Sequence, residues 1–308
     1  MRSATLGAAA AVSPGLASPW PILSGGGSAR AQGTLPLTRI IPSSGARIPA
    51  VGLGTWITFN VGDDPVLRDE CTQVMAAFFA AGGHVIDSSP MYGSAQAVVG
   101  AGLTRLGRPA ALFSADKVWT SDTNGAGQIE TSRRLWGVDR FDLLQVHNLL
   151  SWEAHLQTLF AMKAAGRLRY VGITTSEGRR HDLLAQIMRT QPLDFVQLTY
   201  NVLDREPEQR LLPLAAERGI AVIVNRPFRQ GVLTRRLAGK PLPDWMRATG
   251  ATTWAQVMLK FILSNPAVTV AIPATSRVDH VRENLAAAQG DLPDRALRER
   301  ISAHIAAL

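Results

Sequence analysis

The sequence has little of what marks several common classes of protein. One cysteine, Cys71, in 308 residues excludes an internal disulfide and any zinc or iron–sulfur site built from several cysteines. Charged residues make up 18% of the chain and hydrophobic residues 46%, which is too little charge for a disordered chain and enough apolar material for a large core. No apolar run approaches the ~18 residues of a membrane-spanning helix. The composition therefore indicates a globular protein without a membrane span.

Clustered basic charge is also missing. The 32 Lys and Arg residues exceed the 24 Asp and Glu residues, but the arginines are scattered as pairs such as Arg133 and Arg134. No block of about five basic residues interleaved with aromatic residues occurs, as a nucleic-acid-binding track would require. The net charge of +8 therefore does not indicate a nucleic-acid partner.

Residues 1–33 differ in composition from the rest of the chain. Arg2 is followed by a small apolar stretch from Leu6 to Val12, then by three prolines and three glycines, and Ala29-Arg30-Ala31 precedes Gln32. This is the outline of a secretory signal peptide, although the apolar stretch is short and prolines follow it closely. Two interpretations stay open: export, into a periplasm for example, through a cleaved signal, or a cytoplasmic protein with a disordered, unprocessed leader.

From residue 34 onward, strand-like and helix-like segments alternate. Residues 40–51 predict a short hairpin leading into a strand at residues 51–54. Seven further apolar runs then begin at His84, Ala111, Phe141, Arg169, Asp194, Ile220 and Val268. Most of these starts are 25 to 30 residues apart, which fits one strand and one helix per interval. The strands are nearly continuous apolar runs, which is typical of parallel strands buried on both faces.

The segments between the strands have helical spacing. Cys71, Val74, Met75, Phe78 and Phe79 form one apolar stripe, and residues 254–263 read as another helix, after a surface loop over residues 229–249. Eight parallel strands with helical crossovers predict an α/β fold, a (β/α)8 TIM barrel over residues 34–308 with a short N-terminal hairpin. A doubly wound dinucleotide fold is the rival, but Gly52-Leu53-Gly54 lacks its third glycine.

Four polar residues stand where the strands of such a barrel end. Asp87 closes the second strand and Tyr92 follows it, Lys117 closes the third strand, and His147 the fourth. The separations from Asp87 to Lys117 and from Lys117 to His147 are both 30 residues, so the side chains should converge on one mouth of the barrel. A lysine beside a phenol favours phenolate, so we expect the pKa of Tyr92 to fall from about 10 and the phenol to act as a general acid.

The sequence resembles the aldo/keto reductase family. Five motifs carry the resemblance, over essentially all of residues 38–290: Gly52-Leu53-Gly54-Thr55-Trp56, Val85-Ile86-Asp87-Ser88-Ser89-Pro90-Met91-Tyr92-Gly93, Lys117-Val118-Trp119, Leu143-Leu144-Gln145-Val146-His147 and Ile272-Pro273 with Arg282-Glu283-Asn284. The resemblance implies an NAD(P)H-dependent reductase of aldehydes or ketones, or the reverse. Tyr92 would protonate the carbonyl oxygen, Lys117 paired with Asp87 would tune Tyr92, and His147 would orient the carbonyl group.

The resemblance also implies a path for the cofactor. The nicotinamide end would contact Thr55, Asp87, Thr174, Thr175 and Gln197, and the adenosine end Thr275, Ser276, Arg277 and Asn284. Where many relatives have a tyrosine that stacks on the nicotinamide, this chain has Asn225 or Arg226. Ala274 follows Pro273 where relatives often have a lysine, which leaves Arg277 and Arg282 as nearby cations. An arginine fork suits a 2′-phosphate, so NADP(H) is favoured, with NAD(H) as the alternative.

Other features of the sequence complete the expectation. Trp56 and Phe59 follow the first expected strand and Trp119 follows Lys117, and we expect these three residues to wall an apolar substrate pocket. The remaining histidines show no metal-ligand spacing, so no metal is expected. The alternative function is a nicotinamide-binding redox sensor or accessory protein with negligible turnover. The sequence does not determine the carbonyl substrate or the oligomeric state.

Overall fold

The computed structural model describes residues 36–122 and 125–308 and confirms the barrel. Eight parallel strands follow one another in a single sheet, in chain order. They are β3 (Leu53–Gly54), β4 (Val85–Asp87), β5 (Phe113–Val118), β6 (Phe141–Val146), β7 (Leu168–Thr174), β8 (Phe195–Thr199), β9 (Ala221–Asn225) and β10 (Val270–Ala271). The seven expected strand starts lie within two residues of those observed. The interpretation of residues 1–33 as a leader lies outside the described residues.

Two parallel bridges close the sheet into a barrel. Val51 pairs with Ala271 and Gly54 with Ala274, which joins the first strand to the last. A side chain on Gly54 would lie 2.8 Å from the carbonyl oxygen of Ile272, closer than real Cβ atoms approach such an atom. Glycine is therefore required there by the approach of β3 to β10, a structural role for a residue of the Gly52-Leu53-Gly54 motif.

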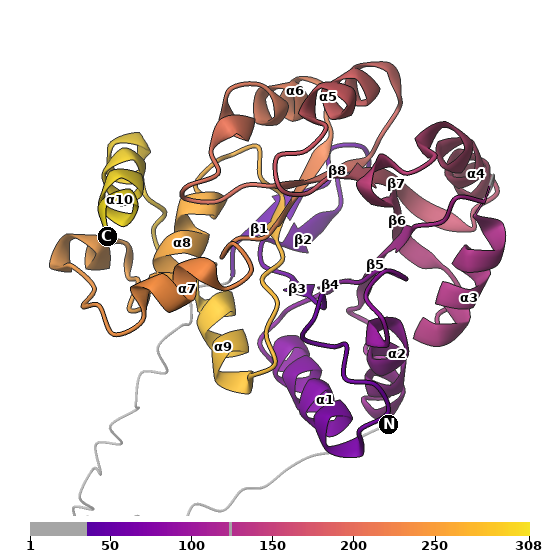
Figure 1. Cartoon of the computed structure of the whole chain (residues 1–308), viewed down its shortest axis with the longest axis horizontal. Coiled ribbons are helices and arrows are strands. Elements are labelled where there is room, and N and C mark those ends of the chain that lie inside the picture. The colour runs from indigo at the N-terminus through magenta and orange to yellow at the C-terminus, as the bar shows by residue number, and fades with distance from the viewer. Residues whose placement is uncertain (1–35, 123–124) are drawn as a thin grey trace, which may run out of the picture. The chain divides into compact units, whose positions relative to one another are not determined.

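Helices surround the strands (Figure 1). They are α1 (Pro65–Ala80), α2 (Ala95–Arg105), α3 (Ala126–Trp136), α4 (Trp152–Ala164), α5 (His181–Thr190), α6 (Leu211–Glu217), α7 (Val232–Leu237), α8 (Trp254–Leu263), α9 (Val278–Ala286) and α10 (Arg295–Ala307). The expected helix over residues 254–263 is confirmed, but residues 229–249 are not one loop. They contain α7, in which Leu233 and Leu237 lie one turn apart and are both buried, and also a 3₁₀ helix, η3 (Asp244–Thr249). No helix among the described residues has the length and apolarity to cross a membrane.

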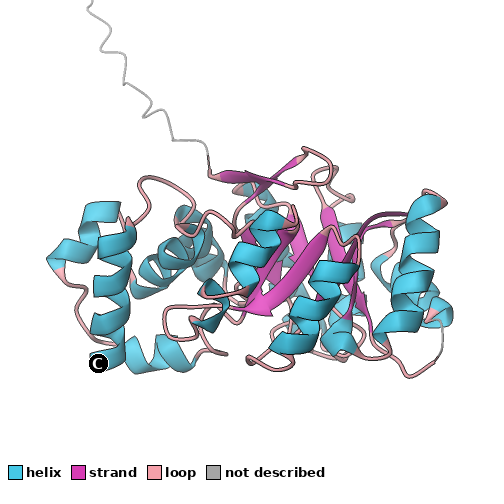
Figure 2. Ribbon diagram, turned by 90° about the horizontal axis from the view of Figure 1, so that it is seen from above, coloured by secondary structure: helices cyan, strands magenta, loops and turns pink. Residues whose placement is uncertain are grey.

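The core has two parts, as a barrel requires. The larger cluster lies between the strands and the helices, and a smaller one fills the barrel interior. The expected hairpin, β1 (Thr38–Ile40) paired antiparallel with β2 (Arg47–Pro49), lies across one end of the strands (Figure 2). Ile41 and Ile48 from this hairpin belong to the interior cluster, so the hairpin closes that end of the barrel. The other end, where the strands finish, is left for the polar residues.

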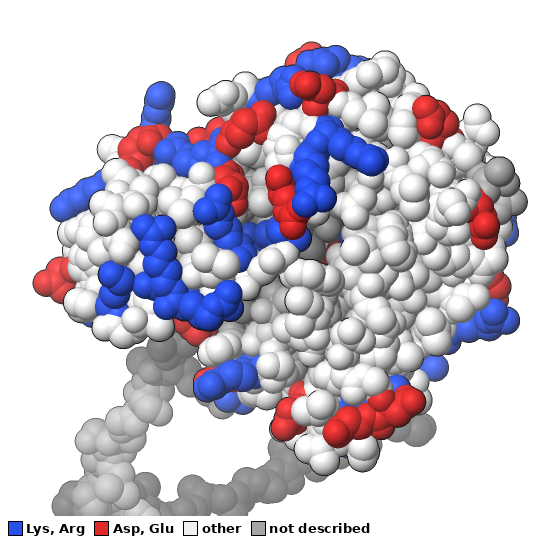
Figure 3. Space-filling view, viewed as in Figure 1, with Lys and Arg blue, Asp and Glu red and all other residues white. Residues whose placement is uncertain are grey.

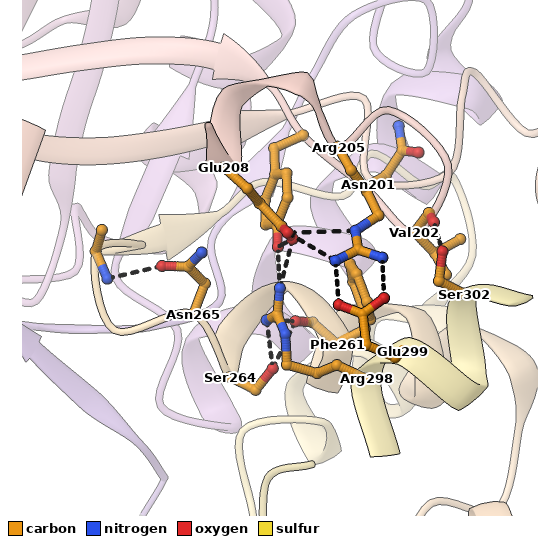
Figure 4. Close-up of polar contacts among 12 residues, drawn as sticks. Asn201, Val202, Arg205, Glu208, Phe261, Ser264, Asn265, Arg298, Glu299 and Ser302 are labelled. Carbon is orange, nitrogen blue, oxygen red and sulfur yellow. Dashed lines mark hydrogen bonds and ion pairs between the residues drawn. The ribbon is translucent and has the colours of Figure 1, made fainter. Parts of the chain in front are cut away.

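A buried polar cluster anchors α10 to the barrel (Figure 4). The guanidinium of Arg298 donates to the backbone oxygen of Phe261 at 2.8 Å and to the hydroxyl of Tyr200 at 2.6 Å, and it pairs with Glu208 at 2.5 Å. Arg205 joins the same Glu208 to Glu299 of α10. Ion pairs and hydrogen bonds in a largely buried place therefore hold α10 to the barrel.

We predict that Arg298→Met destabilises the protein by about 3 kcal/mol, because it leaves buried acceptors and half of a largely buried ion pair without their partner. Chemical denaturation of the full chain measures this. Arg295→Met, an exposed change in the first turn of the same helix, is the control and should shift the free energy of unfolding by less than about 0.5 kcal/mol. Equal effects of the two changes would contradict the anchoring role.

Candidate functional site

The centre of the site is a buried ion pair between two neighbouring strands. Asp87 is the last residue of β4, and Lys117 lies near the end of β5. The Lys117 ammonium contacts both carboxylate oxygens of Asp87, one at 2.7 Å, and donates to the backbone oxygen of Ser88 at 2.8 Å. Both side chains are almost fully buried. Adjacent parallel strands that end at one height bring these two groups together, as the spacing of 30 residues predicts.

Tyr92 lies beside this pair. The Lys117 ammonium is 5.0 Å from the centre of the Tyr92 ring. Burial raises the pKa of Tyr92 above its ordinary value; the charge of Lys117 lowers the pKa but does not outweigh burial. Our expectation of a depressed pKa is therefore wrong in its net direction, although the lysine acts with the expected sign. The phenol keeps its proton at neutral pH.

Burial works to lower the pKa of Lys117, but the charges of Asp87 and Tyr92 and the hydrogen bond to Asp87 outweigh it and raise the pKa. The lysine is therefore an ammonium ion at neutral pH. A fixed positive charge thus lies next to the tyrosine hydroxyl, where it stabilises negative charge that develops on the phenol oxygen.

His147 follows β6 and starts a short 3₁₀ helix, η1 (His147–Leu149). Its ring meets the Tyr92 ring edge-on, with 5.7 Å between the ring centres and an angle of 86°. Burial, helped by the positive charge of Lys117, lowers the pKa of His147 to about 2. The imidazole is therefore neutral. Its Nδ1 atom is 2.8 Å from the hydroxyl oxygen of Ser89.

Several residues expected to hold the nicotinamide form one hydrogen-bonded row. Gln197 donates to Asp87 at 2.8 Å and accepts from the Asn225 amide at 3.4 Å. Asn225 also donates to the backbone oxygen of Thr175 at 2.9 Å. Thr55 donates its hydroxyl to the backbone oxygen of Asp87 at 3.0 Å. The structure thus adds a contact that the sequence did not indicate: Gln197 helps to hold the Asp87 carboxylate.

A cavity of about 330 Å³ opens above these groups. Of the expected residues it is lined by Thr55, Trp56, Asp87, Tyr92, His147, Thr174, Gln197, Asn225 and Arg226. Phe59 is fully buried in the outer core and Trp119 is 40% exposed, and neither lines the cavity. This corrects our expectation that they form its walls. The apolar walls that the sequence analysis missed are Ile57, Met91 and Phe228, in loops whose side-chain directions no spacing rule gives.

A second cavity, of about 360 Å³, lies next to the first. It is lined by Thr275 and Asn284, as expected for the adenosine end, and also by Lys240 and His280. Phe228, Gly231 and Ala274 line both cavities, so the two lie next to each other, and we call the pair the trough. Ser276 and Arg277 are not among its lining residues; the exposed Arg277 guanidinium is paired with Asp279 at 2.5 Å. Basic side chains gather on the side of the molecule where α7 and α10 lie (Figure 3).

A second buried carboxyl group, that of Asp116, precedes Lys117 on β5. Asp116 is fully buried, accepts from the side-chain amide of Gln96 at 2.6 Å and from the Lys117 backbone N–H at 2.8 Å. Burial raises its pKa to about 7, against opposing contributions from Lys117 and Gln96. A folded-state pKa above the unfolded value of about 3.9 means that folding is favoured at low pH, and that this contribution is lost as pH rises through 7.

We predict that Asp116→Asn gains stability relative to the parent chain as pH rises from 5 to 8, because the amide stays neutral while the carboxyl group must ionise in a buried place. Melting temperatures measured across this range test it. Asp244→Asn, at a fully exposed position, is the control and should give a constant difference. A constant difference for Asp116→Asn as well would show that Asp116 does not titrate in this range.

Comparisons with known proteins point to one family. The profile of the aldo/keto reductase family matches residues 50–303. The Escherichia coli methylglyoxal reductase YeaE is 27% identical over 83% of this chain and 90% of its own length. The NADH-specific methylglyoxal reductase of the same organism is 26% identical over 69% of this chain and 73% of its own length.

Solved structures show the same fold. An aldo-keto reductase from Klebsiella pneumoniae in complex with NADPH superposes with a TM-score of 0.72 at 23% identity, over 88% of this chain and 95% of that one. The holo form of an aldo-keto reductase from Bacillus halodurans gives a TM-score of 0.70 at 22% identity, over 87% and 96%.

Proposed function

The chain belongs to the aldo/keto reductase family, and we propose that it reduces an aldehyde or ketone to an alcohol with a nicotinamide cofactor and with Tyr92 as the general acid. The observation that carries the proposal is the buried Lys117–Asp87 pair beside the Tyr92 ring, with neutral His147 next to it at the base of the cavity. These four groups supply a proton, a charge to stabilise the phenolate that remains, and a second contact for the carbonyl oxygen.

The trough fits a dinucleotide. Two cavities that share Phe228, Gly231 and Ala274 lie next to each other, one lined by Tyr92 and the other by Asn284, as the two ends of an extended ligand require. Near its nicotinamide end, the hydroxyl of Thr175 is buried and has no hydrogen-bond partner among the described residues. Thr55, Thr174, Gln197 and Asn225 would surround this end, and Thr275 and Asn284 the adenosine end.

The reaction is divided between the cofactor and the chain. When bound, a reduced nicotinamide supplies a hydride, that is a proton together with two electrons, to the carbonyl carbon. Tyr92 gives its hydroxyl proton to the carbonyl oxygen as negative charge develops there. Lys117 stabilises the resulting phenolate, and Asp87 keeps the ammonium in place. Solvent then returns a proton to Tyr92.

The cavity favours an uncharged substrate. Among its lining residues only Asp87 and Arg226 carry charge. Asp87 is paired with Lys117, and Arg226 is paired with Glu177 at 2.6 Å and lies 5.5 Å from the centre of the Trp56 ring. Neither charge is free to bind an ionic substrate group, while Trp56, Ile57, Met91 and Phe228 offer apolar surface. Small uncharged carbonyl compounds, methylglyoxal among them, therefore form the first test panel.

We predict that the purified protein oxidises NADPH with one or more members of an aldehyde panel, and that Tyr92→Phe lowers kcat by about 10³-fold while the Kd for NADPH stays unchanged. Tyr170→Phe is the matched control, because its hydroxyl bonds to Ser44 in the hairpin that closes the other end of the barrel. Steady-state kinetics and fluorescence titration measure both quantities. Tight binding of NADPH without turnover in the parent chain would favour a sensor or accessory protein instead.

We further propose that NADPH is preferred over NADH. The exposed pair between Arg277 and Asp279 contributes little stability, so Arg277 is free to exchange Asp279 for a 2′-phosphate at the start of α9. Lys240 adds positive charge to the adjoining cavity wall, which Glu283 also lines.

Arg277→Ala should raise the KM for NADPH by at least about tenfold and leave the KM for NADH unchanged. Asp279→Asn should lower the KM for NADPH, because it removes the carboxylate that competes for the guanidinium. Initial rates measured with each cofactor give the KM values for NADPH and NADH. Equal effects of Arg277→Ala on the two cofactors would reject the role of Arg277 in recognising the phosphate.

A further inference from the structure

A neutral imidazole has two tautomers, and only one of them makes a given nitrogen a hydrogen-bond donor. In His147 the Nδ1 atom is engaged by the Ser89 hydroxyl at 2.8 Å. His147 also lines the cavity, so its other nitrogen, Nε2, is the one left for a ligand there. Whether Nε2 carries the proton decides whether His147 attracts or repels a carbonyl oxygen.

The hydrogen bonds of Ser89 determine the position of that proton. Ser89 is fully buried, and its hydroxyl oxygen accepts from the backbone N–H of Met91 at 3.1 Å. The hydroxyl has a single proton to donate, and Nδ1 of His147 is the one acceptor that the described residues offer it. If Nδ1 carried the proton instead, the Ser89 hydroxyl proton would be buried without an acceptor, which is unfavourable. The bond therefore runs from Ser89 to Nδ1.

We propose that Ser89 is a positioning residue that holds neutral His147 in the tautomer protonated on Nε2, so that this N–H donates to the carbonyl oxygen of the substrate. The proposal rests on the proposed function for its catalytic consequence, but not for the tautomer itself. In the opposite tautomer the Nε2 lone pair would face the lone pairs of the carbonyl oxygen and repel them. Tyr92 and His147 would then no longer act together on the same atom.

The local fold explains why this serine can do so. Ser89 lies two residues after the end of β4, and Tyr92 is three residues further on, with its backbone N–H donating to the Ser89 backbone oxygen at 3.0 Å. One tight turn therefore carries both Tyr92, the proton donor, and Ser89, the residue that orients His147. The adjacent Ser88 has a buried hydroxyl without a hydrogen-bond partner among the described residues, so the two serines are not equivalent.

The tautomer is tested first by ¹⁵N NMR on full-length protein labelled at histidine, with the His147 signals assigned from their loss in His147→Gln. We expect an unprotonated Nδ1 and a protonated Nε2 in the parent chain between pH 6 and 8. Ser89→Ala should give a mixture of tautomers or a protonated Nδ1. A protonated Nδ1 in the parent chain, or an unchanged spectrum in Ser89→Ala, would overturn the proposal.

The catalytic consequence is tested by kinetics. Ser89→Ala should lower kcat about tenfold, as expected for one lost hydrogen bond near the reacting oxygen, and leave the Kd for NADPH unchanged. Ser89→Thr keeps the hydroxyl and should restore most of kcat. Ser264→Ala is the matched control, because that hydroxyl also accepts one bond, from Arg298, and donates another, to the backbone oxygen of Phe261. It should leave kcat unchanged.

The two proposals fail in different ways. Absence of turnover in the parent chain would overturn the proposed function, and the NMR spectrum would still decide the tautomer. Full activity of Ser89→Ala in a chain that turns over substrate would overturn the role of Ser89 alone. A fall in kcat that Ser89→Thr does not restore, with an unchanged tautomer in Ser89→Ala, would also count against it.

Discussion

The site depends on a lysine and an aspartate that are buried together at the ends of two neighbouring strands. Removing two charges from water is costly, and their mutual attraction offsets the cost only when the remaining donors and acceptors are also satisfied. Here the backbone oxygen of Ser88 takes a further bond from the Lys117 ammonium, and Gln197 donates to Asp87. The pair therefore persists because three strands of the barrel converge on it, and the protonation states of its neighbours follow from its position.

Tyr92 and His147 both lie within reach of the ammonium, and both respond to its charge and to burial. For His147 the two effects act in the same direction, and the imidazole is neutral throughout the physiological range. For Tyr92 they oppose one another, and burial prevails. The tyrosine is therefore a phenol that keeps its proton at neutral pH. Burial thus keeps both groups uncharged at neutral pH, with the charge of Lys117 opposing it at Tyr92 and adding to it at His147.

The sequence predicts the barrel and the convergence of Asp87, Lys117 and His147, because a repeat of one strand and one helix fixes the height of each residue in the sheet. It does not predict which atoms meet. Gln197 is expected at the cofactor and is also found on Asp87, Phe59 is in the core, and Arg277 is paired with Asp279. Ser88 and Ser89 cannot be told apart by pattern, since only the turn after β4 directs one hydroxyl toward His147.

The mouth of the barrel also carries backbone strain that the rest of the fold must support. Ile57, Asn148, Arg226 and Gln230 line the cavity and adopt positive φ angles between 50° and 64°, a conformation that side chains other than glycine rarely take. Ile57 follows β3, Asn148 follows β6, and Arg226 and Gln230 share the segment after β9. The strain is therefore spread over three connections around the cavity. A barrel closed at its other end by the hairpin, with α10 anchored through Arg298, provides the stability that offsets it. Strained loops on a rigid frame hold the cavity walls in place, and the buried pair of Asp87 and Lys117 lies on the strands beneath them.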